Sequence, residues 1–162
     1  MTFRIRSYQP ADLESILDIA VAAWQPIVTS SKEIVGEELF EIISPDPDAR
    51  KRERVTGACQ EDDPRQVCIA EIDSEIVDFI TVHMYHDRKV AEIVNNAVST
   101  THHHKGVGTK MYEFVLEKMK QAGMEAAIVT TGGDEAHAPA RRAYEKVGFS
   151  GPAPSVEYHI KL

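Results

Sequence analysis

The sequence predicts an α/β domain with a mixed, mostly antiparallel sheet and helices on both faces. Three runs rich in β-branched residues follow one another across short turns, which is typical of an antiparallel meander: Gln66–Ile72, Glu75–Tyr85 and Val90–Val98. The apolar run 124–130 comes after a helical pattern, so it is expected to lie parallel to Val90–Val98 across a helical crossover. No linker interrupts the chain, and a single domain over residues 1–162 is expected.

The N-terminal third predicts one strand followed by helices. Residues 3–6 alternate apolar and basic side chains, as a half-buried first strand does. Apolar residues then recur at helical spacing over 13–27. A capping box at 30–33 predicts that a second helix begins there and stops before Pro45. Residues 48–57 carry charges of both signs and predict an exposed turn or two of helix.

The C-terminal third predicts two crossover helices and two strands. The helix that begins near Val107 has Phe114 on its expected apolar stripe. The run 124–130 is almost unbroken in its apolar character, so a strand buried on both faces is expected. A second helix is expected over 137–147, and the alternation in 155–162 predicts a last strand.

Composition limits the classes of function. The formal net charge of -8 argues against a nucleic-acid groove; it suits a cationic amine substrate, although an acidic surface also simply favours solubility. No apolar run approaches the length of a membrane span, so no membrane association is expected. Cys59 and Cys68 lack CxxC spacing, and no export signal is recognisable at the N-terminus, so a cytoplasmic location is expected. Adjacent histidines at 102–104 cannot easily converge on one ion, so no metal site is expected.

A basic, glycine-containing turn at 103–109 joins the strand Val90–Val98 to the following helix. The first N–H groups of a helix have no partner within it, and glycines let a phosphate approach the backbone. The turn lacks a full GxGxxG or P-loop pattern, so a plain structural turn and a nucleotide-binding domain are both alternatives at this point.

Three groups of residues, spread over about the last half of the chain, occur in a set order: Ala91-Glu92-Ile93 with Ala97-Val98, His103-x-x-Gly106-x-Gly108, and Ala140-x-x-x-Tyr144-Glu145-Lys146-x-Gly148-Phe149. This ordered set resembles the GCN5-related N-acetyltransferase (GNAT) family. The resemblance implies the acyl-CoA N-acyltransferase fold, with the sheet splayed between its fourth and fifth strands. It also implies transfer of an acetyl group from acetyl-CoA to a primary amine by direct attack.

The resemblance implies roles for two side chains. Glu92 occupies a position where some members of the family have a general base acting through water; its alternative is a side chain that faces solvent or pairs with a neighbouring strand. Tyr144 matches the general acid that protonates the departing thiolate; its alternative is a core tyrosine.

The resemblance also implies a coenzyme A site made largely of backbone. Asn96, Ala97 and Val98 are expected to pair with the pantetheine arm. The pyrophosphate is expected over His103, His104, Lys105, Gly106, Val107, Gly108 and Thr109. His103 stands where the family usually has arginine or glutamine, and His137 stands where an asparagine that contacts the coenzyme is frequent.

Several questions stay open from the sequence. The acceptor is expected to be a small-molecule or peptide amine, and Glu37, Glu38 and Glu41 either meet it or form a solvated helix face. A homodimer is compatible with the resemblance. The alternative function is a non-catalytic acyl-CoA-binding or regulatory module of the same fold.

Overall fold

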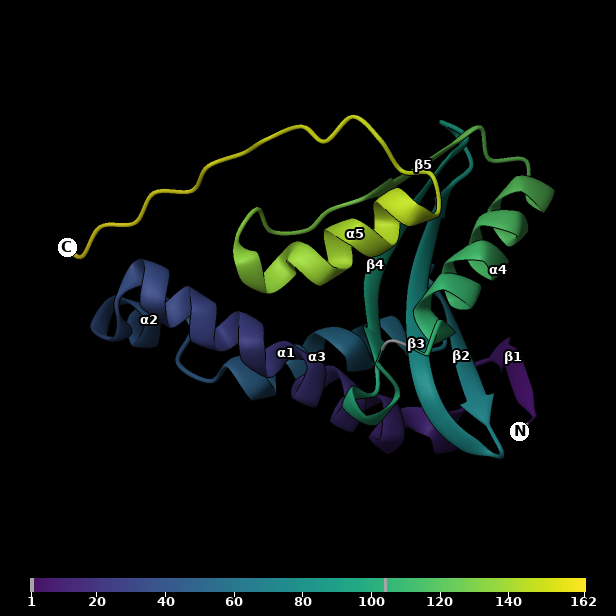
Figure 1. Ribbon diagram of the computed structural model, residues 1–162, viewed down its shortest axis with the longest axis horizontal. Helices are drawn as coiled ribbons and strands as arrows, with labels where there is room; N and C mark the ends of the chain where they lie inside the picture. Colours follow the sequence, from purple (N-terminus) through teal and green to yellow (C-terminus); the bar gives the residue numbers. More distant parts are fainter. Residues whose placement is uncertain (1, 104) are drawn as a thin grey trace.

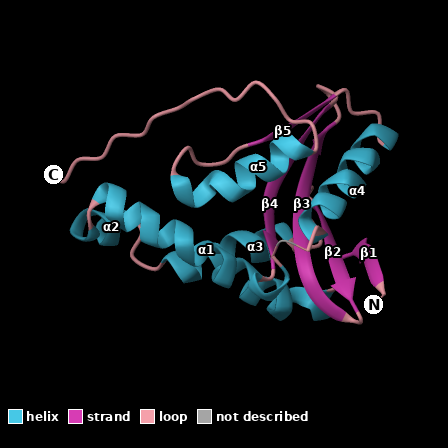
Figure 2. Ribbon diagram, in the orientation of Figure 1, coloured by secondary structure: helices cyan, strands magenta, loops and turns pink. Residues whose placement is uncertain are grey.

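The computed structural model describes residues 2–103 and 105–162 (Figures 1 and 2). Its five-stranded sheet has the order β1-β2-β3-β4-β5. The first four strands are antiparallel to their neighbours, and β4 is parallel to β5. The strands are β1 (Phe3–Ser7), β2 (Gln66–Ile72), β3 (Glu75–Tyr85), β4 (Val90–Val98) and β5 (Ala126–Val129). The expected fold class and the parallel crossover are therefore confirmed.

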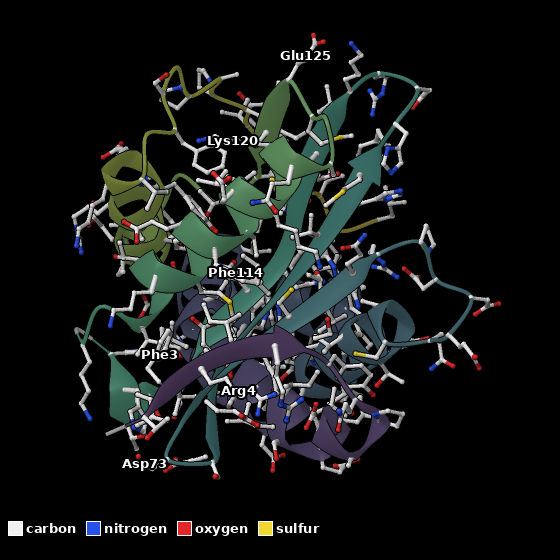
Figure 3. All side chains as sticks on the ribbon, turned by 90° about the vertical axis from the view of Figure 1, so that its right-hand side faces the viewer. Phe3, Arg4, Asp73, Phe114, Lys120 and Glu125 are labelled. Carbon is white, nitrogen blue, oxygen red and sulfur yellow. The ribbon has the colours of Figure 1, made fainter. Side chains whose placement is uncertain are left out.

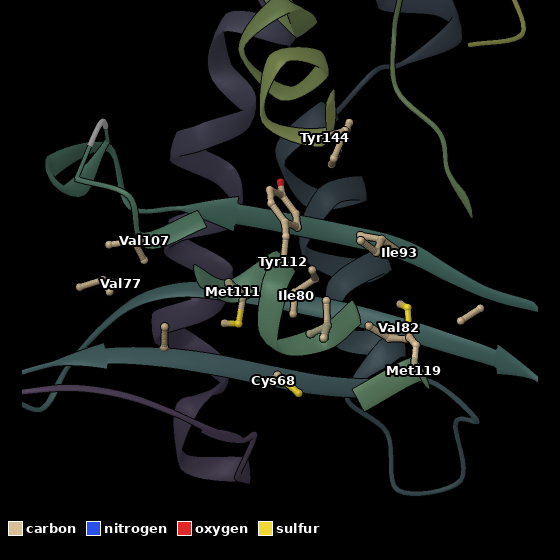
Figure 4. Close-up of a cluster of buried hydrophobic side chains, with 13 residues drawn as sticks. Cys68, Val77, Ile80, Val82, Ile93, Val107, Met111, Tyr112, Met119 and Tyr144 are labelled. Carbon is tan, nitrogen blue, oxygen red and sulfur yellow. The ribbon is translucent and has the colours of Figure 1, made fainter. Parts of the chain in front are cut away.

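The two faces of the sheet carry different helices (Figure 1). The helices are α1 (Leu13–Val35), α2 (Glu37–Ile43), α3 (Pro47–Ala58), α4 (Val107–Gln121) and α5 (Ala138–Lys146), with short 3-10 turns at Pro10–Asp12, Thr100–His102 and Glu135–His137. One core cluster joins α1 and α3 to the sheet through Ile16, Val55 and Phe79. The other joins α4 and α5 to the opposite face through side chains such as Ile80 and Met111 (Figure 4).

The β2–β3 hairpin shows why the meander could be predicted. Asp73 and Ser74 both have positive φ, of 49° and 72°, as a tight two-residue turn with the twist of a hairpin requires. Short polar residues adopt this conformation more readily than other non-glycine residues, so these two residues are enough to predict the turn.

The predicted boundary between the first two helices is wrong. Helix α1 continues through the proposed capping box to Val35, and it ends where Gly36 adopts a φ of 89°. The Ser30 hydroxyl bonds to the carboxylate of Asp134 instead of capping a new helix, so a tertiary contact replaces the local one. Helix α3 is also longer than expected, and it buries Val55 against α1.

The two predicted C-terminal strands differ from the structure. Strand β5 is short, and its Ile128 is 46% exposed, so this strand is not covered on both faces. Residues 155–162 form no strand and extend away from the sheet, with Val156 and Tyr158 exposed (Figure 1). Their alternation predicted a strand, but a strand forms only where a partner edge meets it.

One expected core position on α4 is also wrong. Phe114 is 40% exposed on the outward face of the helix (Figure 3), whereas Tyr112 is buried. The inward face of α4 follows Val107, Met111, Val115 and Met119, and Tyr112 lies beside this stripe. None of the helices in the described part of the chain combines the length and hydropathy that crossing a bilayer requires.

Candidate active site

A cleft of about 1020 Å³ opens where β4 and β5 separate. The two strands pair from Val90 and Ala126 as far as Ile93 and Val129. Strand β4 then continues to Val98, while the chain beyond β5 passes through Thr130 into a loop. The second half of β4, the first turn of α4 and helix α5 line the opening. The splay that the resemblance implies is therefore present.

A bulge in β4 lies at the point of separation. Thr81 of β3 faces Asn95, but the next residue, Val82, faces Ile93, so Val94 is an extra residue in β4. The buried Thr81 hydroxyl accepts the Asn95 backbone N–H at 2.9 Å. Bulges bend a strand and redirect its side chains, so this one turns the end of β4 toward the cleft.

The N-terminus of α4 meets the cleft beside the end of β4. Gly106 precedes the helix with a φ of 77°, and the Lys110 N–H makes the first bond of the helix, to the Gly106 carbonyl, at 3.2 Å. The N–H groups of Val107, Gly108 and Thr109 therefore have no partner within the helix, and all three residues line the cleft. This arrangement can bind an anion.

Gly108 lets α4 approach β4 closely. A Cβ atom at this position would lie 3.2 Å from Val98 Cγ2, which is tighter than ordinary van der Waals contact. The second glycine of the motif is thus required for packing as well as for access to the backbone.

Nine of the residues predicted to bind coenzyme A line this cleft: Asn96, Ala97, Val98, His103, Gly106, Val107, Gly108, Thr109 and His137. Lys105 is exposed and is not part of the cleft lining. His104 lies outside the described residues. The His103 ring Nε2 is 3.1 Å from the Val98 carbonyl oxygen, so this side chain holds the turn against the end of β4.

Tyr144 lies in the cleft within a buried polar network. Its hydroxyl donates to Asn96 Oδ1 at 3.2 Å, and the Asn96 side-chain amide also bonds to the Tyr112 hydroxyl. The rings of Tyr112 and Tyr144 meet edge to face with centroids 5.3 Å apart. Burial raises the pKa of both phenols, so both are protonated at neutral pH. Sequence reasoning missed Tyr112, although its place one residue after Met111 was a usable signal.

Glu92 lines the same cleft and is half-buried on β4. One of its carboxylate oxygens accepts the Tyr85 hydroxyl of β3 at 2.9 Å, and this bond raises the pKa of Tyr85. Glu92 therefore lines the cleft and also pairs across the sheet, and its role as a general base stays a prediction.

His137 connects the loop before α5 to α1. Its Nδ1 bonds to the Asp134 carboxylate, and its ring meets Trp24 edge to face at 6.1 Å between centroids. A side chain at Gly132 would collide with this imidazole. His137 is thus fixed in the cleft wall.

Asp78 is a buried acid that sequence reasoning did not single out. It is 2% exposed, and its Oδ2 has no hydrogen-bond partner among the described residues. That oxygen lies beneath the start of α4, 4.0 Å from where a Cβ at Gly108 would be. Burial raises the pKa of Asp78 well above its ordinary range.

Comparison with known proteins adds two sequence matches. The profile of the acetyltransferase (GNAT) family matches residues 31–149. A Bacillus subtilis (strain 168) protein, described as uncharacterized N-acetyltransferase YsnE, is 31% identical over 72 residues, which are 44% of this chain and 48% of that protein. The match therefore spans about half the length of this curated relative.

Solved structures share the fold at low sequence identity. The PaiA N-acetyltransferase of Thermoplasma acidophilum in complex with coenzyme A has a TM-score of 0.73 at 20% identity, covering 96% of this chain and 94% of that one. An aminoglycoside acetyltransferase from an uncultured soil metagenomic sample, in complex with sisomicin, has a TM-score of 0.60 at 18% identity, covering 99% and 96%.

Proposed function

The chain belongs to the acetyltransferase (GNAT) family, and we propose that it transfers an acetyl group from acetyl-CoA to a primary amine by direct attack. One observation supports this proposal most strongly. The opening between β4 and β5 brings the unpaired N–H groups at the start of α4 and the protonated Tyr144 into one cleft.

Coenzyme A would lie along the second half of β4. The backbone of Asn96, Ala97 and Val98 would pair with the pantetheine arm, because β5 no longer occupies that edge. The pyrophosphate would take the α4 N-terminus, where Val107, Gly108 and Thr109 supply the donors. A related structure, the Thermoplasma acidophilum enzyme, is in complex with coenzyme A.

The reaction forms a C–N bond and breaks a C–S bond. The amine nitrogen attacks the thioester carbonyl carbon, and a backbone N–H near the bulge of β4 stabilises the developing oxyanion. Glu92, acting through water, takes the proton that the nitrogen loses. Tyr144 gives its proton to the departing coenzyme A thiolate, and the products are the N-acetylated amine and coenzyme A.

The Tyr144 network suits this role. Asn96 accepts the Tyr144 hydroxyl and holds the ring at the cleft wall, while Tyr112 holds Asn96 from below. Because burial raises the pKa of Tyr144, the phenol is protonated at neutral pH and its proton is in place when the thiolate departs.

Thiol release tests the catalytic part of this proposal. We expect free coenzyme A to accumulate from acetyl-CoA when a suitable amine is present. Replacement Tyr144→Phe should lower kcat by about a hundredfold or more while acetyl-CoA affinity is unchanged, because only the proton donor is removed. Phe149, whose ring is 5.9 Å from that of Tyr144, offers a matched Phe149→Leu control that keeps the phenol.

Retention of full turnover by Tyr144→Phe would remove Tyr144 from the acid role. Acetyl-CoA binding without thiol release for any amine would instead favour the alternative, a non-catalytic acyl-CoA-binding module. A single domain over residues 1–162, a homodimer and a cytoplasmic location stay predictions.

A further inference from the structure

A second compartment adjoins the cleft between α1, α2 and α3. It has a volume of about 470 Å³, and four residues line both it and the main cleft: Trp24, Ile27, Lys51 and Arg54. The two spaces therefore meet at these side chains. Helix α1 contributes Trp24, and α3 contributes the two cations.

Lys51 is an unusual residue in this wall because it is buried. Its side chain packs over the Trp24 ring with Nζ 4.0 Å from the ring centroid, and the residue is only 9% exposed. Among the described residues, no carboxylate lies within ion-pair distance of Lys51. Burial, and secondarily the nearby charge of Arg54, lower the pKa of Lys51 to about 8.

The other arginines of α3 have partners that Arg54 lacks among the described residues: carboxylates for Arg52 and a backbone carbonyl for Arg50. Arg52 faces away from the compartment and pairs with Asp18 at 2.5 Å and with Glu14 at 3.4 Å. Arg50 donates to the Ile43 carbonyl at 2.8 Å. Arg54 resembles neither, because the described residues place no carboxylate within 4.0 Å of it.

Burying the Lys51 ammonium without an acidic partner is costly for folding, and the exposed Arg54 beside it adds a second positive charge at the mouth of this wall. Of the residues that line the compartment, only Glu53 is acidic; it is exposed, it makes no ion pair with Lys51 or Arg54, and it is not part of the main cleft lining. A chain with a net charge of -8 thus places positive charge without an ion-pair partner among the described residues at this wall of its cleft.

We propose that Lys51 and Arg54 bind an anionic group of the acceptor, so that the acceptor is an amine that also carries a carboxylate or a phosphate. This inference rests on the proposed acetyl transfer and specifies its substrate class. It differs from the expectation, based on overall acidity, that a purely cationic amine would suit this protein. The Trp24 ring covers one side of the Lys51 ammonium and limits its contact with water, which strengthens the charge-assisted hydrogen bond that Lys51 donates to the anion.

Tryptophan fluorescence gives a direct measurement, because Trp24 is the only tryptophan of the chain. The protein saturated with coenzyme A, which cannot acetylate, is titrated with matched pairs of amines. Phenylalanine is compared with phenethylamine for a carboxylate, and phosphoethanolamine with ethanolamine for a phosphate. The pair that shows the larger difference identifies the anion.

We expect the member of at least one pair that carries the carboxylate or phosphate to bind about tenfold or more tightly than the partner that lacks it, the effect of one or two charge-assisted hydrogen bonds. Lys51→Met keeps the length and apolar packing of the side chain, and it should abolish the preference. Arg54→Met should reduce the preference. The matched control is Arg52→Met on the outer face of α3, which should leave it unchanged.

Two results would overturn this inference. One is equal or tighter binding of the amines that lack a carboxylate or phosphate; the other is a preference that survives Lys51→Met combined with Arg54→Met. Acetyl-CoA affinity is measured in the same variants, and a loss there would also count against the proposal, because it would assign the cations to the coenzyme.

Thiol release separates this inference from the proposed function. An anion preference in fluorescence without any thiol release would support the binding site and contradict acetyl transfer. Thiol release from neutral or cationic amines alone would support acetyl transfer and contradict the anion site.

Discussion

The two ends of the cleft differ in how the protein builds them. We call the end proposed to bind coenzyme A the coenzyme end, and the end proposed to bind the amine the acceptor end. At the coenzyme end, α4 begins beside β4, and the groups that line the cleft are backbone N–H groups and glycines. At the acceptor end, α1 and α3 supply the side chains Trp24, Lys51 and Arg54. Close packing shapes the coenzyme end, so a larger side chain there should lower the stability of the fold. Buried positive charge distinguishes the acceptor end, so removing that charge should change the stability and its dependence on pH.

The largest expected effect is on stability at the acceptor end. Lys51→Met removes a buried ammonium and should raise the free energy of unfolding at pH 7 by up to about 3 kcal/mol. Burial lowers the pKa of Lys51 to about 8 in the folded chain, whereas the unfolded chain keeps the ordinary higher value. The cost is full below pH 8 and declines as the pH rises toward the unfolded value.

Urea unfolding between pH 7 and pH 10 measures this difference. The advantage of Lys51→Met should shrink as pH rises, and Arg52→Met should show no such trend. If Lys51→Met is no more stable than wild type at pH 7, then the buried Lys51 ammonium does not destabilise the fold. The acceptor end would then not differ from the coenzyme end in its electrostatics.

The next effect is steric, at the coenzyme end. Gly108→Val places a branched side chain 3.2 Å or less from Val98 and should destabilise the fold by about 1–3 kcal/mol, the usual cost of overpacking. Gly133→Ala is the control, since a Cβ there has no neighbour within 4 Å. Thermal unfolding of both variants tests this, and equal melting temperatures would contradict close packing of α4 on β4.

The smallest expected effect concerns Asp78 beneath α4. Burial raises the pKa of Asp78, so the folded chain binds a proton that the unfolded chain releases at lower pH. Stability from this group is present in acid and is lost as the pH rises from the ordinary value of a carboxyl group toward the raised one. Asp78→Asn should flatten the decline of melting temperature above pH 4, whereas Asp62→Asn in an exposed loop should not. An unchanged slope would mean that Asp78 does not hold this proton.

The same contrast explains what the sequence could predict. The glycine turn, β4 and the Tyr144 helix follow local patterns that occur in a set order along the chain, so the sequence alone identifies Gly108 and Tyr144 as candidate site residues. The five strands can be predicted for the same reason, since their turns are encoded at residues such as Asp73 and Ser74.

The acceptor end could not be predicted, because its residues are ordinary in their local context. Lys51 lies in a run of charges typical of a solvated helix face, and only the packing of α3 on Trp24 buries it. Asp78 lies inside a strand, and nothing local shows that its Oδ2 lacks a partner among the described residues. Likewise, whether residues 155–162 form a strand depends on their lying beside a free edge of the sheet, which their own sequence does not show.

Calorimetric titration with acetyl-CoA tests the central claim most directly, with NAD and ATP as control ligands. Thr109→Glu adds a negative charge in the first turn of α4, where acidic residues favour the helix but repel a pyrophosphate. We expect wild type to bind acetyl-CoA selectively, Thr109→Ser to match it, and Thr109→Glu to bind about a hundredfold more weakly. Equal affinity of Thr109→Glu and wild type, or equally tight binding of NAD or ATP, would contradict a coenzyme A site at this helix.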